Sequence, residues 1–243
     1  MYGVCLLTVI PMRKLPSHKS EMINQVLFGE KFAILEKKKN WSLIKLLHDN
    51  YIGWVNNNQY NKTSNKKLDS YISNKTNCKI KINNIQQELV LGSYIPKGEL
   101  EKKELKIDFK LNFGDISNFN LWFQKIAKKY LNSPYLWGGR TPLGIDCSGY
   151  TQMIYRFFNI NLPRDSFQQA QKGKKITFNN CKMGDLAFFE EKKKINHVGI
   201  LLSNKKIIHS SGKVRIDKFD SIGIYNSNTE KYTHKLKLIK RFI

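Results

Sequence analysis

A cysteine in the C-terminal half of the chain stands in a context that suits nucleophilic chemistry. Cys147 lies in "GIDCSGYTQMIYRFF", residues 144–158, between an aspartate and a serine. The apolar residues that follow it recur at helical spacing, at Tyr150, Met153, Ile154, Phe157 and Phe158. This pattern predicts an amphipathic helix with Cys147 in its first turn. Unpaired backbone N–H groups and the helix dipole favour negative charge there, and the thiolate is the reactive form of cysteine.

Two other roles for Cys147 compete with this one. A lone cysteine is often a small buried residue, but that role explains the apolar stripe and not the Asp-Cys-Ser-Gly context. A zinc site made of one cysteine and two histidines would lack an obvious fourth ligand and the usual paired spacing. The four cysteines also show no regular spacing that would indicate a disulfide framework. We therefore expect a nucleophile, with no metal and no cofactor.

A nucleophilic cysteine needs a base and a group that orients the base, and two of the five histidines have suitable spacing. His197 opens "HVGILL" and His209 ends "KKIIHSS", two predicted strands joined by a turn near Asn204. A hairpin centred on Asn204 puts His209 opposite Gly199 and diagonal to His197, so both imidazoles share one face of the sheet. A two-residue loop would put them on opposite faces. The prediction therefore requires an odd-numbered loop or a bulge.

The surrounding segments predict two kinds of structure. Residues 1–60 contain five short strand-like segments separated by turn residues, which predicts a small all-β barrel. Residues 61–114 are a polar linker followed by a strand-rich connector, with a second small barrel as the alternative. Residues 115–243 run from a helix through a Gly-rich loop to a second helix and then strands, which predicts an α+β domain with an antiparallel sheet.

The chain is strongly basic, but its charge is spread out. Lys and Arg number 42 against 19 Asp and Glu, a formal net charge of +23. Clustered basic residues would favour nucleic acid, whereas these are mostly lysines mixed with Asn and Ile, typical of solvated turns. We therefore expect no nucleic-acid partner.

The start of the chain bears on localisation. Its apolar run precedes the positive charges of Arg13 and Lys14, the reverse of a signal peptide, so a first strand is expected there. No apolar run reaches 18 residues, so no membrane span is expected. The expected location is the cytoplasm, with export as the alternative if the true start lies upstream.

Several stretches together resemble the NlpC-type cysteine peptidases, papain-like enzymes that cut bacterial cell-wall peptides. They are "YLNSPYLWGGRTPLGIDCSGYTQMIYRFFNINLPRDSFQQ", "MGDLAFF" and "NHVGILLSNKKIIHSSG", all within residues 115–243. Residues 27–55, with Gly29, Trp41, Gly53 and Trp54, resemble a bacterial SH3-like domain. The resemblance implies a papain-like α+β domain behind an SH3-like barrel. It also implies hydrolysis of the bond between γ-D-glutamate and the diamino acid of murein peptides.

The resemblance assigns catalytic roles to the residues already singled out. Cys147 is the nucleophile that forms an acyl-enzyme, His197 the general base and His209 the residue that orients it. Backbone N–H groups near Cys147 hold the oxyanion, with Tyr135 as a further donor. The expected partner is a free murein peptide, L-Ala-γ-D-Glu-diamino acid, in turnover or recycling.

Further residues are assigned to substrate binding by the same resemblance. Asp165, in the motif "RDS", binds the free amine of the leading L-Ala. Ser148 and Ser166 hold the α-carboxylate that the γ-linkage leaves free, with Arg164 in support. Trp137 belongs to the family motif "Y-x-W-G-G".

The barrel is also expected to contribute to the part of the site that binds the free amine of the peptide, here called the amine end. By resemblance, Glu30 fits the position of a family glutamate there, and Tyr51 and Tyr60 compete for the position of a family tyrosine.

Several of these residues have a structural alternative. Tyr135 and Trp137 could pack the loop. Asp165 could cap the helix that begins near Ser166, and Asp146 could cap the helix of Cys147. For the whole chain, the alternative is a basic wall- or nucleic-acid-binding protein that keeps the peptidase fold as a scaffold. The intact set of one cysteine and two histidines argues against it.

Overall fold

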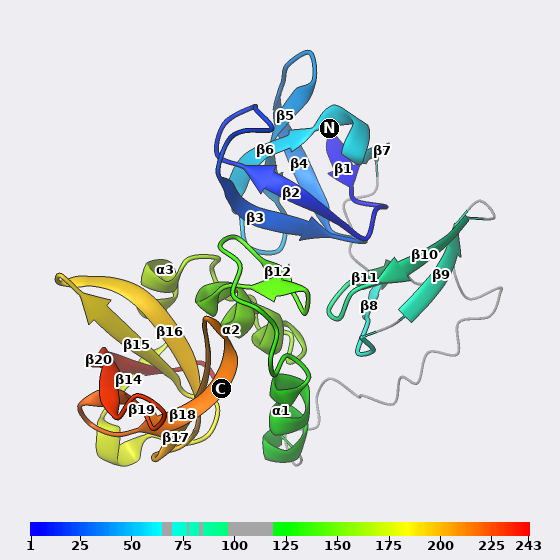
Figure 1. Ribbon diagram of the computed structural model, residues 1–243. Coiled ribbons are helices and arrows are strands. Elements are labelled where there is room, and N and C mark those ends of the chain that lie inside the picture. The colour runs from blue at the N-terminus through cyan, green and yellow to red at the C-terminus, as the bar shows by residue number, and fades with distance from the viewer. Residues whose placement is uncertain (65–69, 77, 83–84, 97–118) are drawn as a thin grey trace. The chain divides into compact units, whose positions relative to one another are not determined.

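The computed structural model describes residues 1–64, 70–76, 78–82, 85–96 and 119–243 (Figure 1). The chain forms two compact units. The first holds residues 1–112 and 137–142, and the second holds residues 113–136 and 143–243. Within the described ranges, no helix has the length and apolar content needed to cross a membrane.

The first unit is built on a seven-stranded antiparallel sheet in the order β3-β2-β6-β5-β4-β1-β7. Its strands are β1 (Tyr2–Val4), β2 (Val9–Arg13), β3 (Met22–Leu27), β4 (Lys31–Lys37), β5 (Trp41–Leu46), β6 (Ile52–Asn56) and β7 (Asn61–Thr63), with the 3-10 helix η1 (Asn57–Gln59) before the last. Inward residues such as Ile10, Met12 and Val26 alternate with outward ones and form the core of a small barrel.

The first predicted strand is interrupted. Residues between β1 and β2 leave the sheet because Cys5 exchanges backbone hydrogen bonds with the turn at Gly29 and Glu30. Gly29 has a positive φ of 77°, and a Cβ there would lie 2.0 Å from the carbonyl oxygen of Tyr94. Glycine is therefore required at this turn.

The described part of the connector packs on the barrel. It contains two two-stranded sheets, formed by β8 (Ser70–Ile72), β9 (Cys78–Ile82), β10 (Ile85–Leu89) and β11 (Tyr94–Pro96). Cys78, Ile80 and Leu89 share a buried cluster with Phe28 of the barrel, and Tyr94 donates its backbone N–H to the Phe28 carbonyl. These strands therefore extend the first unit.

A buried ion pair ties residues 137–142 into the first unit. Arg140 is fully buried and donates two hydrogen bonds of 3.0 Å to the carboxylate of Glu30, which is also fully buried. Arg140 also donates to the backbone carbonyl of Gln25, and the backbone N–H of Leu27 donates to Glu30 at 2.9 Å. Sequence reasoning missed this pair because its partners are 110 residues apart.

The second unit combines helices with an antiparallel sheet whose strands form a ring. The helices are α1 (Phe119–Lys128), α2 (Cys147–Arg156) and α3 (Ser166–Ala170), with the 3-10 helix η3 (Phe178–Asn180). The strands of the ring are β15 (Leu186–Glu191), β16 (Lys194–Ser203), β17 (Lys206–Ser211), β18 (Lys213–Phe219), β19 (Gly223–Asn226) and β20 (Lys231–Arg241). Two short strands of this unit are β13 (Gly144–Ile145) and β14 (Lys174–Ile176). The short strand β12 (Arg140–Thr141) belongs to the first unit.

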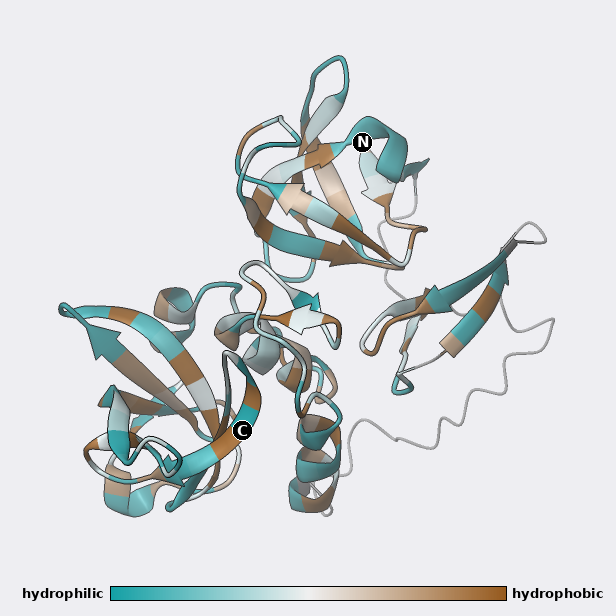
Figure 2. Cartoon of the chain, in the orientation of Figure 1, coloured by the Kyte–Doolittle hydropathy of each residue, from teal (hydrophilic) through white to brown (hydrophobic). Residues whose placement is uncertain are grey.

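The ring closes because β20 pairs with both β15 and β19. Phe189, Leu201 and Ile207 belong to one buried apolar cluster of these strands. Hydropathy alternates along the strands (Figure 2). Helix α2 packs against β16 and β17, and α3 packs against β16. The predicted α+β organisation with an antiparallel sheet is therefore present in this unit.

Glu30→Ala is expected to lower the free energy of unfolding by about 3–5 kcal/mol, because it removes the buried carboxylate that accepts two hydrogen bonds from the Arg140 guanidinium. The matched control is Glu36→Ala in the same barrel, whose ion pair with Lys38 is half exposed and should cost under about 1 kcal/mol. Urea unfolding of the full chain measures both. Equal losses in the two variants would contradict the prediction.

Candidate active site

The register of the β16–β17 hairpin brings two histidines together. Gly199 is the strand partner of His209, and a bulge falls between Leu201 and Ser203, as the predicted pairing required. His197 is therefore diagonal to His209 on the same face. Its Nε2 lies 2.9 Å from Nδ1 of His209, and both side chains are buried.

Cys147 is the first residue of helix α2, as predicted, and its sulfur lies beside the strand of His197. Asp146 caps the helix and accepts a hydrogen bond from the backbone N–H of Gly149 at 2.7 Å. The backbone of Val198, the residue after His197, and the backbone of Ser148 are close enough to the Cys147 thiol to lower its pKa, against the larger effect of burial. These contacts place thiol and imidazole on neighbouring elements of one unit.

A hydroxyl group fixes the segment before Cys147 against the strand of His209. Ser210 is fully buried and donates a hydrogen bond of 2.8 Å to the carbonyl of Ile145. The Ile145 N–H donates in turn to the carbonyl of Pro134. Two residues before the nucleophile, the chain is therefore attached directly to the strand that carries the second histidine.

Burial makes the resting thiol and imidazole neutral. It raises the pKa of the Cys147 thiol to about 12, with a further contribution from the Asp146 carboxylate. Burial also lowers the pKa of His197 well below its ordinary value, and the neighbouring His209 and His234 add to that effect. Desolvation therefore opposes the effect that the helix terminus has on this thiol.

The hydrogen bonds continue beyond the second histidine to a carboxylate. Nε2 of His209 lies 2.9 Å from Oδ2 of Asp217 on β18. Arg215 approaches the same carboxylate with two nitrogens, each at 2.8 Å. Burial raises the pKa of Asp217, but hydrogen bonds from His209 and Arg215 outweigh burial and hold this pKa below its ordinary value.

A third histidine, absent from the sequence prediction, stacks on the first. The ring of His234 on β20 lies 4.1 Å from that of His197, between centroids, at 28°. Burial lowers the pKa of His234 to about 4, so this ring is neutral near pH 7. The His197 ring is thus held by a stack on one side and a hydrogen bond at Nε2.

Arg164 forms a buried cluster with the start of the catalytic helix. It hydrogen-bonds both carboxylate oxygens of Asp146 and donates to the Ser148 hydroxyl at 3.0 Å. The alternative in which Asp146 caps the helix is confirmed. Ser148 is buried at the same helix end, where its hydroxyl donates to Asp146 at 3.3 Å, so binding a ligand carboxylate would require this proton to turn from Asp146 to the ligand.

The remaining predicted residues of the second unit surround the start of α2 or α3. Tyr135 is about one-third exposed, and its backbone N–H donates to the carbonyl of Gly212. Burial, with smaller effects from Cys147 and Asp146, raises its pKa to about 12, so the phenol keeps its proton. Asp165 is the N-cap of α3 in a capping box with Gln168, and Ser166 is the first residue of that helix.

The other predicted ligands lie in the first unit. Trp137 is exposed and donates its indole N–H to Glu21 at 2.8 Å. The Tyr60 hydroxyl lies 2.8 Å from the Ser42 hydroxyl, and both Tyr51 and Tyr60 pack against the barrel core. The carboxylate of Glu30 is engaged by Arg140, as described above. Substrate contacts by these four residues stay predictions.

Two family models match the chain. Residues 132–236 match the NlpC/P60 family, and residues 12–59 match the bacterial dipeptidyl-peptidase Sh3 domain. A solved structure of an NlpC/P60 family protein from Bacillus cereus ATCC 10987 has the same fold, with a TM-score of 0.82 over 99% of both chains at 18% identity.

Curated relatives carry peptidase names. The chain is 29% identical over 211 residues to a gamma-D-glutamyl-L-lysine dipeptidyl-peptidase of Bacillus subtilis, covering 76% of this chain and 71% of the relative. It is 32% identical over 120 residues to a protein of the same name from Bacillus cereus, covering 48% of this chain and 34% of that one. These matches define a peptidase, a hydrolase of peptide bonds.

More closely, the chain carries an NlpC/P60 domain, matched over residues 132–236, behind a bacterial dipeptidyl-peptidase Sh3 domain, matched over residues 12–59. The resemblance read from the sequence motifs is confirmed.

The pH profile of activity should be flat over a wide range around neutrality. His197 must be neutral to accept a proton, and its pKa is lowered, so activity is lost only as pH falls well below 6.5. The thiol pKa of about 12 gives no thiolate gain through pH 9. Between pH 7 and pH 9, kcat at saturating peptide should vary by roughly twofold at most. A tenfold rise across this range would contradict the neutral pair.

Ser210→Ala should lower kcat by about 10- to 100-fold with little change in KM, because the segment before Cys147 loses its attachment to the strand of His209. The matched control is Ser211→Ala, one residue along the same strand, which should keep wild-type kcat. Steady-state kinetics on a murein peptide compares them. Wild-type kcat in Ser210→Ala would show that this hydrogen bond does not position the nucleophile.

Proposed function

We propose that the chain is a cysteine endopeptidase that hydrolyses the bond between γ-D-glutamate and the diamino acid in peptidoglycan-derived peptides. One observation carries the chemistry. Nε2 of His197 is engaged by His209, which leaves Nδ1 as its free basic nitrogen, and the next residue in that strand contacts Cys147. The names of two relatives support the choice of bond.

The first step makes an acyl-enzyme. The Cys147 thiol gives its proton to Nδ1 of His197 while the sulfur attacks the γ-carbonyl carbon of D-glutamate. Because the resting pair is neutral, proton transfer accompanies the attack. The carbon–nitrogen bond then breaks, and His197 returns the proton to the leaving amine of the diamino acid. A thioester to Cys147 remains.

The second step releases the product. Water gives a proton to His197 and adds to the thioester carbonyl, and the carbon–sulfur bond then breaks as the thiol recovers its proton. In both steps negative charge collects on the carbonyl oxygen. Backbone N–H groups at the start of α2 are the donors placed nearest to Cys147, and the protonated phenol of Tyr135 is a further donor.

We assign the second unit to the papain-like α+β class, in which a helix carrying the nucleophile packs on an antiparallel sheet carrying the base. Helix α2 and strands β16 and β17 have this arrangement. Ser148 and Ser166, with Arg164 in support, suit the free α-carboxylate of D-glutamate, and Asp165 at the start of α3 suits the amine end.

The proposed substrate is a small free peptide, L-Ala-γ-D-Glu followed by a diamino acid, in murein turnover or recycling within the cytoplasm. A free amine on the leading alanine is an electrostatic partner for the Asp165 carboxylate. Peptides still attached to glycan lack that amine and should be poor substrates.

The test is release of the dipeptide L-Ala-D-Glu from L-Ala-γ-D-Glu-L-Lys and from the meso-diaminopimelate peptide, followed by mass spectrometry. The wild type should release it, and Cys147→Ala should reduce the rate at least about 10³-fold. The matched control is Cys181→Ala, because Cys181 is a free, half-buried thiol outside the site. It should keep wild-type activity.

Three outcomes would overturn the proposal: an inactive wild type, an active Cys147→Ala, or cleavage at another bond of the same peptide. The N-acetylated peptide supplies a further comparison, since blocking the amine should raise KM. Trapping of an acylated Cys147 by rapid acid quench would support the thioester step.

A further inference from the structure

We propose that Asp217, held by Arg215, is a positioning residue that sets the protonation of both histidines and so exposes the basic nitrogen of His197 to the thiol. The proposal deepens the function above and rests on it. It adds a carboxylate on a third strand to the cysteine and two histidines that the sequence motifs indicate.

The first step is the contact between His209 and Asp217. An ionised carboxylate only accepts hydrogen bonds, and its Oδ2 lies 2.9 Å from Nε2 of His209. Nε2 of His209 must therefore carry a proton and donate it. Burial lowers the pKa of His209, against the opposing effect of Asp217, so the ring holds one proton and its Nδ1 is left as an acceptor.

In the second step, the tautomer of His209 fixes the tautomer of His197. Nδ1 of His209 is an acceptor, and it lies 2.9 Å from Nε2 of His197. Nε2 of His197 must then be the donor, and the neutral ring keeps its lone pair on Nδ1. That is the nitrogen which the proposed mechanism needs unprotonated. The carboxylate thus fixes two tautomers through two consecutive hydrogen bonds.

The third step concerns the charge of Asp217. A carboxylate that took up a proton could donate to His209 and reverse both tautomers. Arg215 prevents this by approaching both carboxylate oxygens at 2.8 Å. The groups that face His209 and Asp217 from the neighbouring strands are His197 on β16, His234 on β20 and Arg215 on β18. Among these, Arg215 is the permanent charge.

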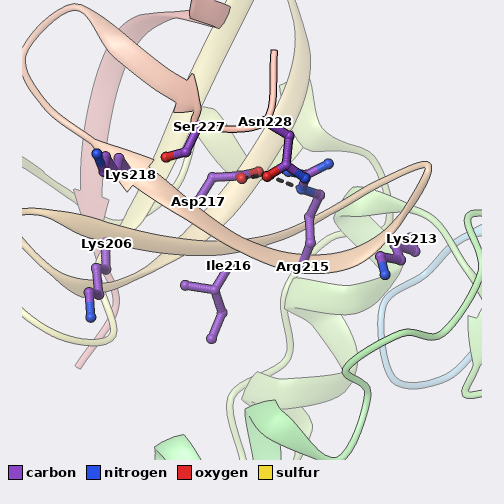
Figure 3. A pocket seen from close by; sticks show the side chains of 8 residues that line it. All are labelled: Lys206, Lys213, Arg215, Ile216, Asp217, Lys218, Ser227 and Asn228. Atoms are coloured by element: carbon purple, nitrogen blue, oxygen red, sulfur yellow. Dashed lines mark hydrogen bonds and ion pairs between the residues drawn. The ribbon is translucent and has the colours of Figure 1, made fainter. Parts of the chain in front are cut away.

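A pocket gives solvent access to this ion pair. It has a volume of about 420 Å³, and Figure 3 shows Asp217 and Arg215 facing each other within it. Its lining residues are Lys206, Lys213, Arg215, Ile216, Asp217, Lys218, Ser227 and Asn228. Four of these are cationic, so the pocket favours the ionised form of Asp217. If the Asp217 carboxylate were removed by mutation, the same positive charge would attract a small anion to its position.

The first test reads the tautomers directly in the full-length wild type. Long-range ¹H–¹⁵N correlation spectra of histidine-labelled protein at pH 7.5 should show His209 and His197 protonated at Nε2 and not at Nδ1. In Asp217→Ala, His209 should lose this single tautomer. A wild type with His209 protonated at Nδ1 would overturn the proposal whether or not the protein cleaves peptides.

The second test is kinetic and uses chemical rescue. Asp217→Ala should lower kcat about 10- to 100-fold with KM nearly unchanged, because the base is misoriented while the substrate contacts stay. Sodium formate should restore at least about tenfold in kcat by supplying a carboxylate through the pocket, and sodium chloride at equal ionic strength should not. A merely structural role for Asp217 predicts no rescue.

The matched control is Asp220→Ala. Asp220 follows the same strand, and its carboxylate accepts hydrogen bonds from Tyr232 and from the backbone at Ile222 and Gly223. This variant should keep wild-type tautomers and should not respond to formate. Wild-type kcat in Asp217→Ala, or loss of kcat that formate leaves unchanged, would refute the positioning role. An inactive wild type with the expected tautomers would refute the peptidase proposal and leave the hydrogen-bonded series standing.

Discussion

The hydrogen bond between His197 and His209 is the contact on which the rest of the site depends, and it is a matter of strand register. Side chains alternate between the faces of a sheet, so a shift of one residue in the β16–β17 pairing would turn His209 away from His197. The bulge between Leu201 and Ser203 sets this pairing. A local irregularity four to six residues along the strand from His197 thus decides whether the base has a partner.

In the series His197, His209, Asp217 and Arg215, the most exposed group is at the Arg215 end. His197 and His209 are buried and neutral, Asp217 is 8% exposed and ionised, and the Arg215 side chain is 25% exposed. Within this series, charge is therefore kept at the end where water can stabilise it, and the inner end holds two neutral rings. This arrangement avoids the large desolvation cost of a buried imidazolium in the resting enzyme. In the proposed mechanism, His197 becomes charged only when it takes the proton of the Cys147 thiol.

The sequence alone was enough for the residues whose positions follow from local rules. Cys147 was found from an apolar stripe and its context, and the two histidines from hairpin arithmetic. Asp217 could have been found in the same way, because a hairpin centred on Gly212 puts Arg215 opposite His209 and Asp217 diagonal to it, as the structure has it. His234 could not, since it reaches His197 only when β20 closes the ring of strands.

Energetic balance was also beyond sequence reasoning. The helix terminus correctly indicated where Cys147 lies, but the protonation of its thiol depends on how completely the surrounding side chains exclude water. The same limit applies to Glu30, whose buried partner is supplied by a segment 110 residues later. Predicting either case requires the packing of the folded chain, because burial has a large effect on the free energy of a charged group.

The path of the chain between Tyr135 and Cys147 has a consequence for how such proteins can be recombined. Residues 137–142 leave the second unit, fold with the first and return just before the nucleophile. Removing the barrel would leave Arg140 without Glu30 in the segment that leads to Cys147. The barrel is therefore not an interchangeable accessory domain. During evolution or engineering, a new N-terminal module would have to arrive together with a matching sequence for this segment.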